Sequence, residues 1–350
     1  MKALVFKKPY KIGLEEIQNP SINDNEILVE VAFCGICGTD LHIYEGKVPF
    51  VKYPLVPGHE LSGKIIQVGS EVRNHSLGDH VALNPNLSCV DYNIKSSQYC
   101  YYCKKKRPHF CLNWKALGVT EPGGFAEFIK SPASAAIKIP SKVPLREALF
   151  MEPIACCLHG LNNAKNSIIE TAAVIGAGPI GLLMISLLKH LFKAEIYVFE
   201  PKKLRRELAI KFGAHQVVNT EQYSIIEYIS QQTDNNGVDL SIEAVGNAQT
   251  SMEAIKILNR GGQALLFGVA SPRTEIPLDI FKVYENELHI FGSFTNPHEN
   301  QNAIDILQKN VIDINSLITK EYSLNELESG FSSMRIESSD EIKTIVNCQA

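Results

Sequence analysis

The sequence has little of what nucleic-acid-binding and membrane-spanning proteins need. Its 34 Lys and Arg residues are outnumbered by 38 Asp and Glu residues, so the formal net charge is −4. Binders of nucleic acid usually carry a basic excess, so no such partner is expected. The longest uncharged stretch, residues 172–188, is just too short for a membrane span and holds three Gly and a Pro in its first half. "MKALVF" lacks the apolar core of a signal peptide, so we expect a cytoplasmic protein that does not engage a membrane.

Internal repeats and low-complexity segments are also lacking. The composition, 45% hydrophobic and 21% charged, is ordinary for a globular protein, and 350 residues are too many for one small core. Two domains are expected. Thiols stay reduced in the cytoplasm, so clusters among the nine Cys residues are more readily metal ligands than disulfides.

The pattern of apolar runs and turns differs between the first and second parts of the chain. Residues 1 to about 150 hold short apolar runs with Gly-rich turns, such as "EILVEVAFCGICG", "LSGKIIQVGS", "HVAL" and "GGFAEFIK", which predict a β-rich domain. From residue 171, helical patterns separate most of the apolar runs "TAAVIG", "AEIYVFE", "QVVN", "VDLSIEAVG", "QALLFGV" and "ELHIFGS". This alternation predicts an α/β domain built on a parallel sheet.

The residues after about 294 are too few to fold alone. They contain a predicted helix, "ENQNAIDILQK", a helical stretch near 324–335 and a last strand, "KTIVNC". We expect this tail to return to the first domain and make it discontinuous. The expected domains are therefore residues 1–153 with 295–350, and residues 154–294.

The segment "VIGAGPIG" carries Gly176, Gly178 and Gly181 as G-x-G-x-x-G, after a predicted strand and before a helix that opens with Pro179 and Ile180. The first Gly permits a tight turn, the second lets the backbone approach a pyrophosphate, and the third lets helix and strand pack closely. Free N–H groups at the helix start can bind the phosphates. The pattern predicts a doubly wound Rossmann domain. The alternative is a Gly-rich turn that only packs a structural sheet.

The second predicted strand ends in Glu200, 22 residues after Gly178. An acid at this place accepts hydrogen bonds from the adenine-ribose hydroxyls and repels a 2′-phosphate, which favours NAD over NADP. Arg205 can stack on the adenine ring. The surrounding basic cluster of residues 202–206 can also accept a phosphate, so NADP remains the alternative.

Possible zinc ligands stand in "FCGICGTDLHIYEG" and "PLVPGHELSG". Cys37, His59 and Glu60 each lie near Gly, and a catalytic zinc needs about three protein ligands and one open position. Glu152, in "FMEPIACCLHG", offers a further carboxylate where the first domain ends. The plainer interpretation of a single Cys or His is core packing. Cys34 with Cys37 also spells C-x-x-C, which is compatible with redox chemistry or a zinc knuckle.

Four more cysteines lie in "CVDYNIKSSQYCYYCKKKRPHFC". The last three are spaced C-x2-C-x7-C, and the first stands well upstream. The residues alone leave open a metal site, a disulfide pair or coincidence, although the expected reducing compartment favours metal.

The chain resembles the zinc-dependent medium-chain dehydrogenases, close to the branch of polyol (sorbitol-like) and L-threonine 3-dehydrogenases. The matching segments occur in family order and include "CGICGTDLHIYEG", "PGHELSG", "LGDHVAL", "GGFAEFI", "EPIACCLHG", "GAGPIG" and "FEPKKLRRELAIKFGA". The resemblance implies a Rossmann domain plus a discontinuous, β-rich GroES-like catalytic domain, with a structural zinc lobe at about 85–115. One departure is "SSDEIK", which stands where the family has a "GK-V" turn before the last strand.

The resemblance also implies roles for individual residues. The catalytic zinc ligands are matched by Cys37, His59 and Glu152, and Glu60 matches an acid that can exchange at the open position. The proton relay is matched by Thr39 and His42. The four ligands of a second, structural zinc are matched by Cys89, Cys100, Cys103 and Cys111.

About eight extra residues separate Cys89 from Cys100 relative to the spacing that is typical of the family. Lengthening a loop costs only about 0.6 kcal/mol per doubling, so we expect this site to survive with a protruding loop. Because four thiolates leave no open position, its role is to hold the lobe.

The leading hypothesis is oxidation of a secondary alcohol, a polyol in the first place, to the ketone. Zinc stabilises the alkoxide, NAD accepts the hydride, and Thr39 and His42 carry the proton. The site is expected in the cleft between the domains, at the carboxyl edge of the parallel sheet. Candidate walls are Tyr44, Trp114 and Phe294. The family implies a homodimer or homotetramer, with "ELHIFGS" as the strand that pairs across a dimer.

Three rival hypotheses remain. The enzyme alternatives are an L-threonine 3-dehydrogenase and a dehydrogenase of a phosphorylated polyol, although no extra cation for a phosphate can be placed in the cleft. From another class, the chain is a catalytically silent NAD-binding protein, since fold alone does not fix function. A catalytically silent protein would have no need of the candidate catalytic residues, which are all present: Cys37, Thr39, His42, His59 and Glu152.

Overall fold

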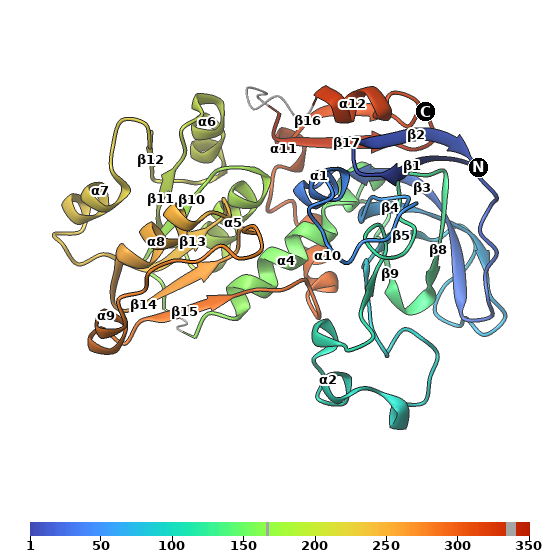
Figure 1. Cartoon of the computed structure of the whole chain (residues 1–350), viewed down its shortest axis with the longest axis horizontal. Coiled ribbons are helices and arrows are strands. Elements are labelled where there is room, and N and C mark those ends of the chain that lie inside the picture. The colour runs from blue at the N-terminus through green and yellow to red at the C-terminus, as the bar shows by residue number, and fades with distance from the viewer. Residues whose placement is uncertain (166–167, 334–340) are drawn as a thin grey trace. The chain divides into compact units, whose positions relative to one another are not determined.

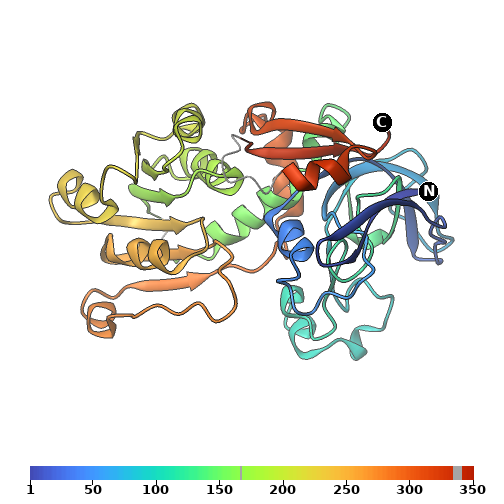
Figure 2. The same ribbon diagram turned by 45° about the horizontal axis from the view of Figure 1, so that its top comes forward.

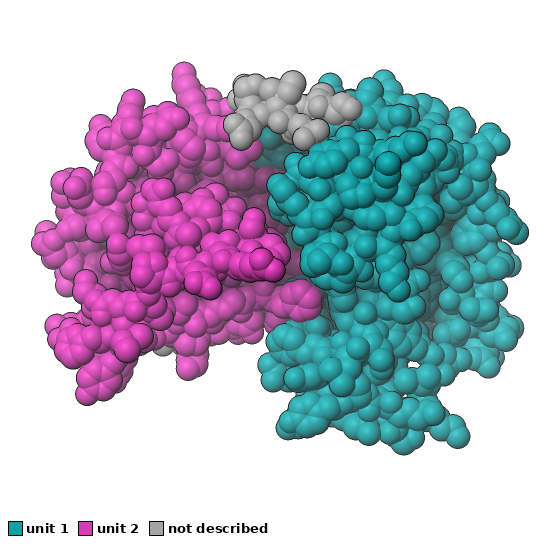
Figure 3. All heavy atoms as spheres, in the orientation of Figure 1, with its two compact units in different colours: residues 1–155, 295–310, 317–350 teal, residues 156–294, 311–316 magenta. Residues whose placement is uncertain are grey.

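The computed structural model describes residues 1–165, 168–333 and 341–350. The chain forms two compact units, coloured separately in Figure 3. Unit 1 holds Met1–Ala155, Thr295–Asn310 and Leu317–Ala350. Unit 2 holds Cys156–Phe294 and Val311–Ser316. No helix among the described residues is both long and apolar enough to cross a bilayer.

Unit 2 is built on one parallel sheet with the strand order β12-β11-β10-β13-β14-β15 (Figures 1 and 2). This is the doubly wound order, in which the first strand of the unit lies in the middle of the sheet. The predicted α/β Rossmann fold is therefore confirmed. Its strands are β10 (Thr171–Ile175), β11 (Glu195–Phe199), β12 (Gln216–Val218), β13 (Val238–Glu243), β14 (Leu258–Leu266) and β15 (His289–Gly292).

Helices alternate with these strands along the chain, as the sequence pattern predicts. They are α5 (Pro179–Leu191), α6 (Lys203–Phe212), α7 (Ile225–Gln232), α8 (Ala248–Lys256) and α9 (Ile280–Glu285). The central strand β10 is almost wholly buried because helices cover both faces of such a sheet. Gly213 caps the C-terminus of helix α6. Its φ of +118° is readily adopted by glycine and is strained for other residues.

Unit 1 is β-rich, as expected. Its largest sheet has the order β16-β17-β3-β4-β5-β9, with β8 also paired to β3. The unit also contains two 2-stranded sheets, β1–β2 and β6–β7. The strands are β1 (Lys2–Lys8), β2 (Lys11–Glu16), β3 (Glu26–Gly35), β4 (Glu60–Val68), β5 (His80–Leu83), β6 (Asn86–Leu87), β7 (Lys115–Ala116), β8 (Phe128–Pro132), β9 (Ala136–Lys138), β16 (Ile318–Ser323) and β17 (Lys343–Asn347).

Short helices connect these strands, and the lobe that carries α2 projects from the body of unit 1 (Figure 1). The helices are α1 (Gly38–Tyr44), α2 (Tyr101–Lys104), α3 (Leu145–Ala148), α4 (Met151–Asn162), α10 (Asn300–Gln308), α11 (Ile314–Leu317) and α12 (Leu327–Ser333), with 3₁₀ turns η1 (Ser96–Gln98), η2 (Pro108–Phe110) and η3 (Ala133–Ala135). α4 and α11 each continue from one unit into the other.

The C-terminal tail differs from the expected division in one segment. Strand β17 pairs antiparallel with β3, in register from Ile345 opposite Gly35 to Asn347 opposite Phe33. Val311–Ser316, however, belongs to unit 2. Polar contacts tie this segment to unit 2: Lys211 of α6 forms an ion pair with Asp313 at 2.8 Å and also donates a hydrogen bond to Ser316. At the other boundary, residues 154–155 stay with unit 1. The end of the expected helical stretch, 334–335, lies outside the described residues.

Candidate active site and metal centres

Three side chains that can ligate a metal converge in unit 1. Potential ligand atoms of Cys37, His59 and Glu60 all lie within 4.8 Å of one another. Cys37 precedes helix α1, and His59 and Glu60 stand where a loop enters β4. The antiparallel register of β3 and β4 sets Glu60 opposite Gly35, where a Cβ would lie 2.3 Å from Oε2 of Glu60. A side chain at residue 35 would therefore displace this carboxylate from its present position.

A buried carboxylate that the sequence reasoning missed orients this group. Asp40 is fully buried and accepts hydrogen bonds from the N–H groups of Cys37 at 2.9 Å and Gly58 at 3.3 Å. Its Oδ1 lies 3.4 Å from Nδ1 of His59. Burial by itself lowers the pKa of His59, but Asp40 raises that pKa well above the usual value. The available signal was the capping spacing, with an acid three residues after Cys37.

The two predicted relay residues lie on α1, half-buried, beside this group. Oγ1 of Thr39 is 3.9 Å from Sγ of Cys37. Nδ1 of His42 is buried and has no hydrogen-bond partner among the described residues. An open nitrogen of this kind can accept a proton.

A second buried partner that sequence reasoning missed is Lys343, the first residue of β17. Its ammonium contacts the carboxylate of Glu60, and both side chains are almost fully buried. Lys343 lies five residues beyond the start of "SSDEIK", whose residues 338–340 lie outside the described part of the chain. A lysine is therefore present at this edge although the "GK-V" turn is absent.

The remaining expected ligand is Glu152, which belongs to the same unit. Glu152 lies in the first turn of α4 and is 9% exposed, but it is not among the side chains gathered around Cys37. Cys34 is fully buried in β3, and burial raises the pKa of its thiol well above the usual value. Cys34 and Cys37 are both free thiols, and Cys34 joins neither metal-ligand cluster found among the described residues.

The four cysteines of the lobe form a second cluster. Sγ of Cys111 lies 3.5 Å from that of Cys89 and 3.8 Å from that of Cys100, and all four sulfurs lie within 4.8 Å of one another. These distances exclude a disulfide. They fit a tetrahedral ion, because zinc–sulfur bonds of about 2.3 Å place sulfurs about 3.8 Å apart. The N–H of Cys103 lowers the pKa of Cys100 to about 6.

Neighbouring groups support the cluster and anchor the extra residues before Cys100. The backbone N–H of Asn113 donates to Sγ of Cys111 at 3.3 Å, and its side-chain amide donates to Sγ of Cys89 at 3.5 Å. The hydroxyl of Tyr92, which lies in the longer loop, donates to the carbonyl of Asn113 at 2.8 Å. The loop is therefore tied to the site without separating Cys89 from the other sulfurs.

The dinucleotide turn in unit 2 has the predicted local geometry. Gly176 has a φ of +94°, and a Cβ on Gly181 would lie 1.9 Å from the carbonyl oxygen of Gly176, so both positions require Gly. Pro179 and Ile180 open helix α5. The buried carboxylate of Glu200 accepts from the N–H groups of Ala177 at 2.8 Å and Lys202 at 3.0 Å.

The basic cluster after Glu200 borders the same turn. Nη1 of Arg205 lies 3.9 Å from where a Cβ on Gly178 would stand, and Nε of Arg205 is buried without a partner among the described residues. Arg206 is occupied by the carbonyls of Glu200 and Pro201. Arg205 is therefore the arginine with an open donor beside the glycine turn.

Of the expected pocket walls, Tyr44 lies in the core. Its ring packs against Phe6 and Phe331, and the residue is 8% exposed. It is therefore not an open wall. Trp114 is half-buried, meets Phe50 edge-to-face and donates from Nε1 to the side chain of Asn86 at 3.3 Å. Phe294 is 49% exposed in unit 2.

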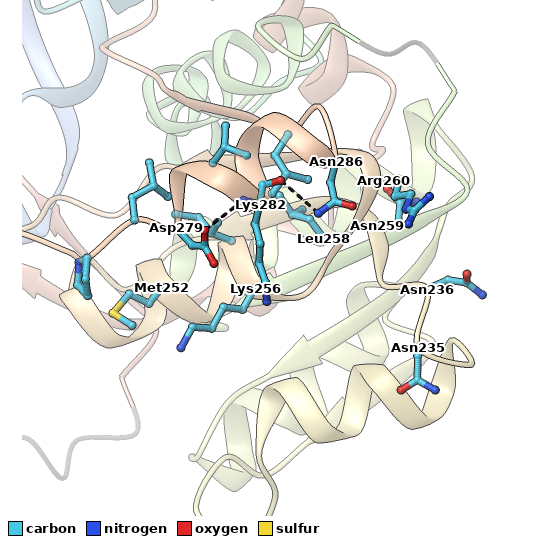
Figure 4. A pocket seen from close by; sticks show the side chains of 15 residues that line it. Asn235, Asn236, Met252, Lys256, Leu258, Asn259, Arg260, Asp279, Lys282 and Asn286 are labelled. Carbon is cyan, nitrogen blue, oxygen red and sulfur yellow. Dashed lines mark hydrogen bonds between the residues drawn. The ribbon is translucent and has the colours of Figure 1, made fainter.

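Unit 2 also contains a cavity of about 680 Å³ at the starting ends of β13, β14 and β15 (Figure 4). Lys256, Arg260 and Lys282 line it together with Asp279 and apolar side chains. The glycine turn and Glu200 follow the opposite, carboxyl ends of β10 and β11. The cavity is therefore separate from the predicted dinucleotide site.

The comparisons with known proteins agree with this geometry. The alcohol dehydrogenase GroES-like domain family matches residues 23–141, and the zinc-binding dehydrogenase family matches residues 179–309. The chain is 30% identical to D-arabinitol dehydrogenase 1 of Uromyces fabae over 337 residues, 95% of this chain and 94% of that protein. It is 32% identical to sorbitol dehydrogenase of Bacillus subtilis over 333 residues, 94% of this chain and 92% of that protein.

Among solved structures, a zinc-binding dehydrogenase from Sinorhizobium meliloti bound to NADP matches with a TM-score of 0.93. The two chains are 30% identical, and the match covers 99% of each. The chain therefore belongs to the zinc-dependent medium-chain dehydrogenases, in the branch of polyol and L-threonine dehydrogenases. It is an oxidoreductase that acts on CH–OH groups, which confirms the predicted family, fold and enzyme class.

Proposed function

We propose that the protein oxidises a secondary alcohol group of a polyol to the ketone with zinc and NAD. The observation that carries the proposal is the convergence of Cys37, His59 and Glu60 beside Thr39 and His42. A thiol, an imidazole and a carboxylate form a donor set that suits zinc. Glu152, although outside the compact group, is the candidate for exchange with Glu60 as the third protein ligand.

The chain's own residues would supply orientation and proton transfer. Bound here, zinc would lower the pKa of an alcohol, and nicotinamide would accept the hydride. Oγ1 of Thr39 lies close enough to Sγ of Cys37 to hold the alcohol proton, and the open Nδ1 of His42 can receive it. Asp40 holds the backbone of Cys37 and lies 3.4 Å from Nδ1 of His59, so its charge stands beside both candidate ligands.

The place of Glu200 supports NAD as the cofactor. A carboxylate has about four lone-pair sites, and the two backbone donors leave room for two ribose hydroxyls. The same charge would repel a 2′-phosphate. The buried Nε of Arg205 beside the turn is the main argument for testing NADP in parallel.

A substrate with several hydroxyls suits the polarity of this site. Asp40, His59, Glu60, Glu152 and Lys343 are all buried, and a site with so many polar groups matches a substrate that carries hydroxyls better than a plain alkyl chain. The polyol relatives agree with this argument.

We further propose that the lobe cysteines hold a second, structural zinc, because their sulfurs already have the spacing of a tetrahedral site. We also propose that the chain forms a homo-oligomer. Strand β15 ends the order of the sheet, and the exposed apolar side chains of Ile280, Phe281 and Tyr284 lie on the preceding helix. Light scattering on the purified protein tests the oligomer.

The first experiment is a substrate panel of polyols, L-threonine and simple secondary alcohols, with NAD and NADP, on protein of measured zinc content. Reduced cofactor is followed by absorbance. We expect polyol turnover with NAD and about two zinc ions per chain. Turnover of L-threonine alone would identify L-threonine as the substrate in place of a polyol and would leave the proposed mechanism unchanged. Absence of turnover with zinc and cofactor bound would contradict the proposed function.

A further inference from the structure

The cavity of unit 2 takes no part in the proposed oxidation. Its volume of about 680 Å³ lies within the range of small-molecule sites, about 300–1,000 Å³. Its walls are helices α8 and α9, the start of β14 and the residues just before β13 and β15 (Figure 4). The glycine turn follows the opposite end of β10, so the cavity needs a ligand other than the dinucleotide.

Each of the two helices turns one face toward the cavity. On α8, the lining residues Met252, Ile255 and Lys256 are three and four positions apart, which places them on one face. The lining residues on and beside α9 have the same helical spacing: Asp279, Lys282, Val283 and Asn286. The walls are therefore regular helix faces, which hold side chains in more constant positions than loops do.

The charges that line the cavity are unequal. Lys256, Arg260 and Lys282 line it, and their side chains form no ion pair with any residue that the structure describes. Asp279 is the one acid among the lining residues, and it accepts from the N–H of Lys282 at 3.1 Å and so caps α9. Three cations against one carboxylate leave the lining with an excess of two positive charges.

This combination of side chains fits a particular kind of ligand. Lysine and arginine bind phosphate, sulfonate and carboxylate groups through charge-assisted hydrogen bonds, and an anion placed among unpaired cations relieves their mutual repulsion. Much of the remaining lining is apolar, including Met252, Leu278 and Val283. A ligand that also carries an apolar part would remove this surface from water.

We propose that this cavity binds a small organic anion that carries two or more negative charges on an apolar frame. The inference goes beyond the proposed oxidation and does not rest on it. Such a ligand leaves the glycine turn free for the cofactor. It also leaves the exposed side chains of Ile280, Phe281 and Tyr284 free for the proposed contact between subunits, because these positions of α9 do not line the cavity.

The test uses naphthyl phosphate as the probe, titrated calorimetrically into the full chain. Saturating NAD is present throughout, so that the probe cannot bind at the dinucleotide turn. Inorganic phosphate supplies the charge alone, and naphthol supplies the apolar frame alone. We expect a Kd below about 1 mM for the probe, at least about tenfold tighter than for either of these two compounds. Added salt should weaken the binding.

Two variants change the charge of the cavity in opposite directions. The K256M/R260M/K282M variant should bind the probe at least about tenfold more weakly, because the three cations are gone. D279N should bind it about three- to tenfold more tightly, because a repelling charge is gone while Asn still caps α9. The matched control is K189M, which removes an exposed lysine of α5 outside the cavity and should change nothing.

Opposite responses of the two charge variants would support binding among these side chains. The proposal would be overturned if the probe bound no better than naphthol, or if the triple variant and D279N both bound it as wild type does. D279N alone keeps the test decisive if the triple variant fails to fold. Calorimetry does not depend on turnover, so a chain that oxidises no alcohol would refute the proposed function and leave this result unchanged.

Discussion

Replacing Asp40 by Asn removes a buried charge while keeping the volume of the side chain. The carboxylate serves two backbone donors, at 2.9 Å and 3.3 Å, and faces Nδ1 of His59 at 3.4 Å. An amide has a single oxygen, so one of these partners meets an N–H₂ group instead. Hydrogen bonds to charged groups contribute about 1.5 to 3 kcal/mol, which sets the expected loss.

The same change is expected to weaken metal binding at Cys37 and His59. Groups that orient metal ligands typically change metal affinity by about 10- to 100-fold, or about 1.4 to 2.8 kcal/mol. The two estimates agree, so D40N should bind zinc at this site about 10- to 100-fold more weakly. The assay is a chelator competition titration of the catalytic metal, with a thermal melt of the metal-free protein alongside.

The matched control is D24N, because Asp24 is an exposed acid of the same unit and lies outside the site. It should leave zinc affinity unchanged. If D40N kept an affinity within about threefold of wild type while its metal-free form remained folded, the orienting role assigned to Asp40 would be wrong.

Three further predictions concern separate parts of the chain. C111S should reduce the zinc content from about two ions per chain to about one, measured by elemental analysis, because three thiolates cannot close the lobe site; two retained ions would contradict this. G181A should abolish dinucleotide binding and lower stability by about 1 to 3 kcal/mol, since the added Cβ would lie 1.9 Å from the carbonyl oxygen of Gly176; calorimetric titration that shows ordinary cofactor binding would refute it. D239N should cost about 1 to 3 kcal/mol at neutral pH, because Oδ2 of Asp239 accepts from the N–H groups of Glu170 at 2.9 Å and Thr171 at 2.8 Å. Burial raises the pKa of Asp239, but the Thr171 and Asn259 donors lower it overall, so the ionised form is the one that folding favours. The difference between wild type and D239N should therefore be complete above about pH 5 and shrink as pH falls through the folded-state pKa, below the unfolded value of about 3.9; a pH-independent difference in denaturant melts would contradict this reasoning.

Local patterns were sufficient for several features. The nucleotide turn can be predicted from the spacing of Gly176, Gly178 and Gly181. The close approach of backbone atoms leaves no room for side chains in this turn, and this requirement is local. The helix from Pro179 to Leu191 follows from an apolar run that opens with Pro. The alternation of strands and helices after residue 171 is enough to predict a parallel sheet, because each strand needs a crossover before the next can pair.

The sequence by itself thus determined the α/β domain, its nucleotide turn and the identity of the metal-ligand candidates, since these depend on spacing along the chain. Only the tertiary structure placed Lys343 against Glu60 and Asp40 against His59, and grouped Glu60 with Cys37 and His59. It also assigned Val311–Ser316 to unit 2 through Asp313. The physical reason is the same in each case. A charged side chain pairs with an opposite charge that the fold brings near, and this partner can lie at any distance along the sequence, so spacing in the sequence does not predict it.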